Sequence, residues 1–178
     1  MAMTLITTNT SSNAASSSFT SGIDSTYKLY IFKFININAA TDGYQFAFNV
    51  SIDGGSNYNV VKTTSTFQAH QAEDGDPAEM GYDASSDLSQ GTGYQRLSIY
   101  GLSNAADASS SGELYLFNPS STTYAKHFYS EMNSMQENDY SVHGYAAGYA
   151  NTTSAVNAVD FKILSGNFDG VIKLYGVG

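Results

Sequence analysis

The chain has 178 residues, of which 7 are Lys or Arg and 16 are Asp or Glu, so its formal net charge is −9. Its length suits one domain, and its negative charge argues against partners such as nucleic acid or anionic membranes. The lack of cysteine excludes disulfides and thiolate chemistry. No apolar run approaches the ~20 residues that span a bilayer, and residues 1–15 lack the basic region of a Sec signal peptide, so neither feature is expected.

The N-terminal region is rich in Ser, Thr, Asn and Ala, and residues 8–25 carry no charge before Asp24. We expect residues 1–25 to form an extended N-terminal arm with a short strand at Thr4–Thr7. Residues 26–178 are expected to form a single β-sandwich domain. Two interpretations of the arm stay open: a loose terminus, or a segment that becomes ordered against a neighbouring subunit.

Strand signals begin after the arm. In Tyr27–Ile37, apolar residues occupy both the odd-numbered and the even-numbered positions, so both faces of the expected strand are apolar. This pattern indicates a strand that is central in a sheet or covered by another subunit. Tyr44–Asp53 alternates between apolar and polar residues, which is typical of a half-buried strand. Phe46 and Phe48 occupy its apolar positions and are predicted to be core residues.

Residues 53–56, with the sequence DGGS, favour a turn, so we expect a hairpin that returns through Tyr58–Phe67. Residues 70–93 interrupt the strand pattern and predict a long polar loop that is acidic and lacks Lys and Arg. Clustered carboxylates are the ligands that Ca²⁺ prefers, so Asp74, Asp76 and Glu79 are candidates for a calcium site. Their spacing does not fit an EF-hand, and a solvated acidic loop is the alternative.

Further strand signals and turns follow this loop to the end of the sequence. The predicted strands are Tyr94–Leu102, Gly112–Asn118, Tyr124–Asn133, Tyr140–Ala150, Val159–Leu164 and Phe168–Tyr175. Many short strands separated by turn signals predict an all-β fold, an antiparallel β-sandwich of jelly-roll type. The last strand is expected to pair deep within a sheet.

Signatures of catalysis are missing from the sequence. The histidines His70, His127 and His143 form no zinc motif, and the sequence contains no nucleophile elbow or phosphate-binding loop. Glycoside hydrolysis needs two acids that converge in a cleft; Glu113 and Glu131 lie on predicted strands and Asp139 and Asp160 flank others, but isolated acids of this kind are usually exposed. We therefore predict no catalytic residue, no confident metal ligand and no cofactor apart from the possible calcium ion.

Tyrosines are concentrated in the C-terminal half of the chain, where Tyr140, Tyr145 and Tyr149 lie on one predicted strand. A tyrosine combines a large apolar ring with a polar tip, so it stacks on sugar rings or anchors a protein partner. These three residues are the candidates for a binding site or a subunit interface.

Six segments of the sequence carry a resemblance to a known family. They are Tyr27–Asp42, which contains YKLYIFKFININ; Ser51–Tyr58; Ser86–Gln95; Ser111–Phe128, which contains NPSSTTYAKHF; Gly148–Val156; and Leu164–Gly176, which contains GVIKLYG. Together they resemble small structural proteins encoded by tailed phages, especially phages of marine bacteria and cyanobacteria. The members are mostly described as structural or tail-fibre proteins. The resemblance covers about residues 22–176 and brings no catalytic residues.

The resemblance implies a non-enzymatic virion protein on the exterior of the particle. Two placements follow, a tail-fibre or adhesion module and a head decoration (cement) protein that clamps capsid subunits. The expected partners are further copies of the chain, with a trimer favoured by architectural analogy, other virion proteins and a host-surface glycan. The alternative function is a tail-associated carbohydrate-binding or carbohydrate-active protein.

Overall fold

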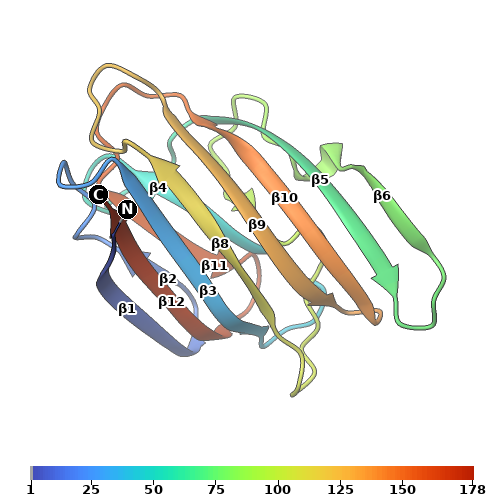
Figure 1. Cartoon of the computed structure of the whole chain (residues 1–178). Coiled ribbons are helices and arrows are strands. Elements are labelled where there is room, and N and C mark those ends of the chain that lie inside the picture. The colour runs from blue at the N-terminus through green and yellow to red at the C-terminus, as the bar shows by residue number, and fades with distance from the viewer. Residues whose placement is uncertain (1) are drawn as a thin grey trace.

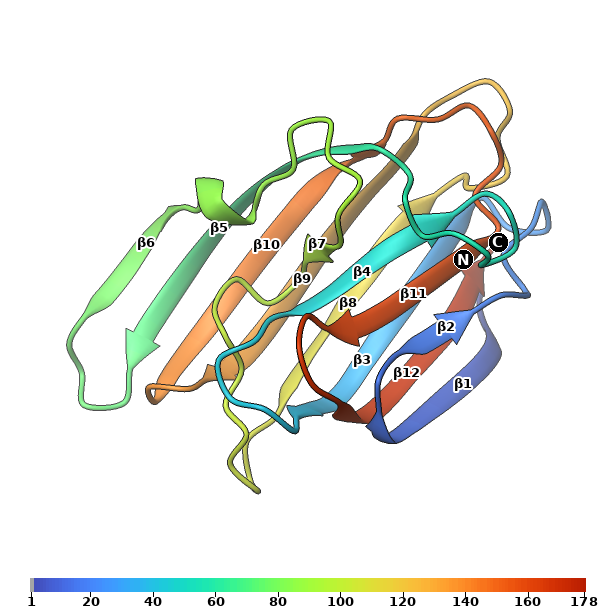
Figure 2. The same ribbon diagram turned by 180° about the vertical axis from the view of Figure 1, so that it is seen from behind.

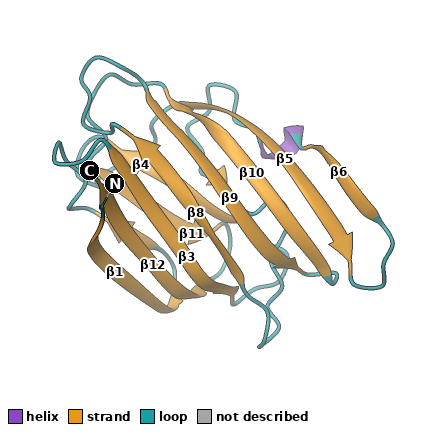
Figure 3. Ribbon diagram, viewed as in Figure 1, coloured by secondary structure: helices purple, strands orange, loops and turns teal. Residues whose placement is uncertain are grey.

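The computed structural model describes residues 2–178, and its regular structure is almost entirely β-strand (Figures 1 and 3). The strands are β1 (Met3–Ala14), β2 (Ser17–Phe19), β3 (Leu29–Ala39), β4 (Phe46–Ser51), β5 (Lys62–Ala72), β6 (Ala78–Tyr82), β7 (Gln95–Arg96), β8 (Ser110–Phe117), β9 (Lys126–Gln136), β10 (Tyr140–Ala150), β11 (Ala158–Ile163) and β12 (Phe168–Val177). One turn of 3₁₀-helix, η1 (Ala84–Ser86), follows β6. The predicted all-β class is confirmed.

Two antiparallel sheets pack face to face. The large sheet has eight strands in the order β1-β12-β3-β8-β9-β10-β5-β6, and the small sheet has four in the order β2-β11-β4-β7. Figure 2 shows the small sheet in front of one end of the large sheet, while β5 and β6 extend beyond it. The predicted antiparallel sandwich is therefore confirmed, and the large sheet is wider than the layer that covers it.

An aromatic cluster fills the space between the sheets. Phe161 of β11 lies at its centre, with its ring 5.0 Å from that of Phe32 and 5.2 Å from that of Phe34. Phe46 and Phe48 of β4 also contact Phe161, and all five rings are almost completely inaccessible to solvent. The prediction that Phe46 and Phe48 belong to the core is confirmed.

The strand β4 differs in one respect from the half-buried strand that its sequence predicts. All six of its residues are buried, including the polar Asn49 and Ser51. The side of the small sheet that faces away from the core is covered by irregular segments, since Asn49 Nδ2 donates to the carbonyls of Tyr58 and Thr92 at 2.6 and 3.0 Å. Local polarity therefore predicted the wrong exposure for these positions, because loops can satisfy buried polar groups.

The N-terminal segment, expected as an arm, is part of the sandwich; Met1 lies outside the described residues. Strand β1 forms the edge of the large sheet through a ladder with β12 that runs from Met3↔Val177 to Ala14↔Phe168. The side chain of Ile6 packs against the core. The backbone hydrogen bonds of this ladder hold a polar strand in place that lacks a hydrophobic pattern of its own.

The expected hairpin between Tyr44–Asp53 and Tyr58–Phe67 is wrong. Strand β4 belongs to the small sheet, where β11 and β7 occupy both of its edges. The chain then crosses to the large sheet, where β5 pairs with β10 and β6. The turn residues after β4 thus lead from one layer to the other.

Two further segments depart from their predicted states. Within the expected loop at 70–93, β5 continues to Ala72 and β6 pairs with it, so a hairpin replaces most of that loop. The predicted strand Tyr94–Leu102 is reduced to the two residues of β7. Its remainder is irregular but well buried at Leu97 and Ile99, so its apolar residues serve the core without a regular ladder.

Candidate functional site

The large sheet leaves one of its faces without a covering layer, and we call this side the outer face (Figure 1). Successive side chains of a strand point to opposite faces, so in β9 the buried residues point to the small sheet and the exposed ones lie on the outer face. Large apolar side chains remain exposed on it, among them Met3, Leu5, Ile35, Phe67, Phe117, Tyr129 and Met135. Large apolar side chains that remain exposed on one face are a feature of surfaces that bind other molecules.

Aromatic side chains form stacked pairs across neighbouring strands of the outer face. The rings of Tyr115 and Tyr129 are stacked with centroids 4.5 Å apart, and Phe117 lies 5.8 Å from Tyr129. Further along the same face, Phe67 of β5 stacks on Tyr145 of β10 with ring centroids 4.6 Å apart. These pairs fix the rings in place, so the outer face presents an ordered aromatic surface.

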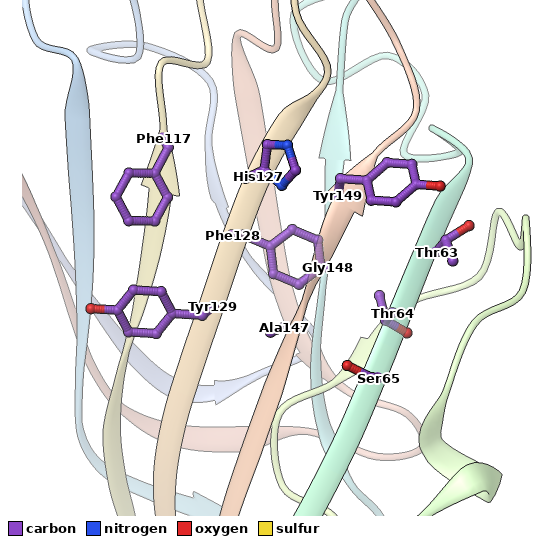
Figure 4. Close-up of a pocket in the computed structure, with 10 residues that line it drawn as sticks. All are labelled: Thr63, Thr64, Ser65, Phe117, His127, Phe128, Tyr129, Ala147, Gly148 and Tyr149. Carbon is purple, nitrogen blue, oxygen red and sulfur yellow. The ribbon is translucent and has the colours of Figure 1, made fainter.

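A shallow hollow of about 510 Å³ lies beside the rings of Phe117 and Tyr129 (Figure 4). Phe117 and Tyr129 stand on one side of it, and Tyr149 on the other. Small side chains, including Ala147, lie between these rings, which is why the surface is hollowed there. We call this depression the aromatic hollow; its further lining residues are Thr63, Thr64, Ser65, His127, Phe128 and Gly148.

Charged residues of the outer face form one row across four neighbouring strands. The strand registers place Lys173 opposite Lys33, Lys33 opposite Glu113, and Glu113 opposite Glu131. Lys33 Nζ forms an ion pair with Glu113 Oε2 at 2.6 Å. His143 Nε2 lies 3.2 Å from Glu131 Oε1.

The pKa of Glu113 bears on whether this row can act as an acid pair. Partial burial raises the pKa of Glu113, but hydrogen bonds from Lys33 and Tyr115 outweigh that effect and leave it below its ordinary value. Hydrolysis of a glycoside requires one carboxyl group that keeps its proton near neutral pH. Glu113 is ionised there, which does not suit it to donate a proton.

The three tyrosines predicted as one site are divided between the two faces of the sheet. Tyr145 and Tyr149 lie on the outer face, the second of them in the aromatic hollow. Tyr140 lies on the opposite face, where it lines a smaller depression of about 240 Å³ with His70 and Tyr100. The spacing accounts for this division, because residues 140 and 145 are an odd number of positions apart on a strand.

The calcium candidates lie in and beside the turn between β5 and β6. The amide of Asp76 donates to Asp74 Oδ1 at 3.2 Å, and Glu79 lies on β6 opposite His70. Within residues 2–178, no three His, Asp or Glu side chains come together in a group that would hold a metal ion. Calcium binding by Asp74, Asp76 and Glu79 stays a prediction.

Other residues of the outer face did not stand out in the sequence. Phe117, Tyr129 and Phe67 contribute to its aromatic surface, although they lie on three different strands. Burial alternates strictly along Lys126–Gln136 and places Tyr129 on the exposed side, but polarity does not follow it, since Ser130 is buried and Tyr129 is exposed. Its proximity to Phe117 depends on the pairing of β8 with β9, which the sequence does not specify locally.

Two further findings concern the chain as a whole rather than the outer face. Among the described residues, no helix is long and apolar enough to cross a membrane. No protein-family model matches the chain, and no curated protein matches it.

Proposed function

We propose that the protein is a non-enzymatic structural component of a phage virion, located on the exterior of the particle. The single observation that carries the assembly role is the outer face, where exposed apolar side chains such as Ile35 and Phe117 lie on an ordered sheet. Exposed apolar side chains gathered on one face suit a protein that works in contact with neighbours. The phage origin is supported by the resemblance of segments such as NPSSTTYAKHF and GVIKLYG to structural proteins of tailed phages.

A jelly-roll architecture is part of this proposal. Eight of the strands follow the orders β1-β12-β3-β8 and β2-β11-β4-β7. Within each of these two sheets, strands from the beginning of the chain pair with strands from its end. In this interpretation the hairpins β5–β6 and β9–β10 are insertions that widen one sheet. Double-sheet jelly rolls occur in viral capsid proteins and in lectins, so the strand order supports a virion role by analogy of fold.

Two placements on the particle fit the outer face. As a head decoration (cement) protein, the chain would cover junctions between capsid subunits with this surface. As a tail-fibre or adhesion module, it would pack against other tail proteins and expose its loops to the host. Strand β1 is paired within the large sheet, so residues 3–14 do not form a free arm that would reach across neighbouring capsid subunits. The expected trimer stays a prediction.

Immunogold electron microscopy of purified phage particles tests the virion role. The antibody should recognise the exposed turn at residues 53–57, because this turn follows β4 of the small sheet and stays free when the outer face is covered. We expect label on the particle, over the head for a decoration protein or along the tail for an adhesion module. Unlabelled particles, together with detection of the protein only in the infected-cell lysate, would contradict the proposal.

Carbohydrate binding is the second candidate, and the aromatic hollow favours it. Tyr149, Tyr129 and Phe117 surround a depression with a floor of small residues. Aromatic rings held in this way stack on the apolar faces of sugars. The low pKa of Glu113 makes binding a better match than hydrolysis.

The change Tyr149→Ala tests this second function. It is expected to weaken binding to purified host-surface polysaccharide by about tenfold, because one aromatic contact contributes about 1 kcal/mol or more. Titration calorimetry measures the effect. Tyr140→Ala is the matched control, since this tyrosine lies on the same strand but faces the other way. Equal losses in both variants, or equal binding by both, would contradict a site in the aromatic hollow.

A further inference from the structure

The charged row on the outer face has an unusual order of signs. From β12 to β9 it consists of Lys173, Lys33, Glu113 and Glu131, two cations followed by two anions. Like charges directly opposite each other on neighbouring strands are unfavourable, and this order contains two such neighbouring pairs. Lys33 and Glu113 form an ion pair at the centre, whereas Lys173 makes no ion pair within residues 2–178.

This order becomes complementary when a second copy is laid on the face. A two-fold axis between the copies, parallel to the strands and midway between β3 and β8, reverses the order of strands in the facing sheet. Lys173 then lies across from the partner's Glu131, and Lys33 lies across from the partner's Glu113. Every charge of the row meets its opposite, and the same holds in the other direction because the contact is isologous.

The apolar residues beside the row are matched by the same operation. The adjacent row crosses the same four strands and consists of residues that lie directly opposite one another, Tyr175, Ile31, Tyr115 and Tyr129. The two-fold places Tyr175 across from the partner's Tyr129 and Ile31 across from the partner's Tyr115. Sheets that pack face to face usually cross at about 30°. A tilt of the strands by half that angle from the axis preserves the two-fold and shifts the outermost pairs most, so the correspondence is closest for the residues of β3 and β8.

The size of the face suits a stable contact. The two-fold places three strands of one copy across from three strands of the other. The strands β1, β12 and β3 face the partner's β10, β9 and β8, and the reverse holds on the other side of the axis. With about 4.8 Å between strands and about 3.3 Å per residue, six strands of eight residues cover about 750 Å². A standard stable interface buries about 800 Å² per partner, while β5 and β6 would extend past the edge of the facing sheet.

We propose that the outer face binds a second copy of this chain about that two-fold axis, with Lys173 paired to Glu131 across the interface. The contact rests on the proposed use of the outer face in assembly, and the two can fail separately. Gold label on particles together with a chain that does not dimerise would leave the virion role standing and would overturn the two-fold contact.

Charge reversal tests the contact. Lys173→Glu and Glu131→Lys, each alone, place like charges across the interface twice per dimer, and we expect each to raise the dissociation constant by about tenfold or more. The double variant Lys173→Glu with Glu131→Lys restores opposite charges and is expected to return the constant to within about threefold of the original. Sedimentation velocity of the full chain over a range of concentrations measures the constant.

Matched controls separate the interface from general effects of charge. Lys28→Glu and Asp107→Lys make the same changes at exposed positions outside the strands and are expected to leave dimerisation unchanged. Within one chain, each single reversal in the row also replaces a like-charge neighbour with an opposite one. Glu131→Lys additionally gives up the contact with His143, so thermal stability at a concentration below dimerisation is expected to change little. The fold should therefore survive the variants.

Several outcomes would overturn the two-fold contact. They are a chain that stays monomeric at all concentrations, a trimer without an even-numbered species, and single variants that dimerise like the original. A correctly folded double variant that fails to regain association would exclude this register of the two copies. A dimer that follows the expected pattern of loss and rescue supports the contact.

Discussion

Replacing Phe161 with alanine is expected to lower the free energy of unfolding by about 3–5 kcal/mol, as removal of a fully buried phenylalanine does elsewhere. Phe161 is the largest expected single-site effect because its ring touches aromatic rings from both sheets, including Phe32 and Phe34 of the large sheet and Phe46 of the small one. These neighbours are held on strands and cannot collapse into the space. Urea denaturation at one fixed protein concentration measures the loss.

Tyr124→Ala is the control for this experiment. Tyr124 is 70% exposed and lies in the segment that precedes β9, so we expect its removal to change the free energy of unfolding by less than about 0.5 kcal/mol. A loss below about 1 kcal/mol for Phe161→Ala would mean that the two sheets do not pack through this aromatic cluster.

The free energy of unfolding is expected to depend strongly on pH above pH 8. The reason is a buried lysine that has no carboxylate partner among residues 2–178. Lys62 of β5 is fully buried, and its Nζ donates to Asn49 Oδ1 at 2.5 Å and to the Val60 carbonyl at 2.8 Å. Burial lowers the pKa of Lys62 from 10.5 to about 8. The folded chain therefore releases this proton at a lower pH than the unfolded chain does.

The sign of the pH effect follows from this difference. Below pH 8 both states hold the proton, whereas between pH 8 and about 10 the unfolded state binds more protons, so the free energy of unfolding rises with pH. We expect a gain of about 2 kcal/mol between pH 7 and 9.5. The gain ends near pH 10, since burial and the hydrogen bond to Asp160 raise the pKa of Tyr94, and a raised tyrosine pKa acts in the opposite direction.

Lys62→Met removes this titration, so most of the rise between pH 7 and 9.5 is expected to disappear. Burial also lowers the pKa of Lys126, and a small slope of the same sign should remain. Lys28→Met is the control, because Lys28 is exposed. Urea denaturation at both pH values measures the slope. If Lys62→Met keeps the full slope, another group is responsible for it.

The sequence predicted those strands whose burial follows a local pattern. The two apolar alternations of residues 27–37 correspond to β3, which buries Phe32 and Phe34 on one side and exposes Ile35 on the outer face. The last strand is paired along both of its edges, with β1 and β3, although it is only one strand in from the edge of the sheet. In these elements the side chains themselves supply most of the stabilising burial, so their spacing is informative.

Elements stabilised by distant pairing were missed. Strand β1 is polar over much of its length and exists because it pairs with β12. Strand β6 is exposed at every residue, so it has no burial pattern to detect. The pairing of strands from separate parts of the chain also decides which outer-face residues are neighbours, and this is why Tyr129 and Phe117 were not grouped. The grouping of Tyr140 with Tyr145 was wrong for a local reason, since residues an odd number of positions apart on one strand face opposite sides of the sheet.

The position of β12 determines which part of the large sheet can form only at the end of synthesis of the fold. Strand β12 is the neighbour that joins β1 to β3 in the large sheet, although β1 and β3 leave the ribosome long before it. Residues 3–14 therefore have no ladder partner in that sheet until residues 168–177 have been synthesised. During translation β1 must wait as an unpaired strand, and contacts of such long sequence separation form slowly. Closure of this edge of the sandwich therefore waits for the last strand of the fold, and chaperones that shield unpaired strands would act during this interval.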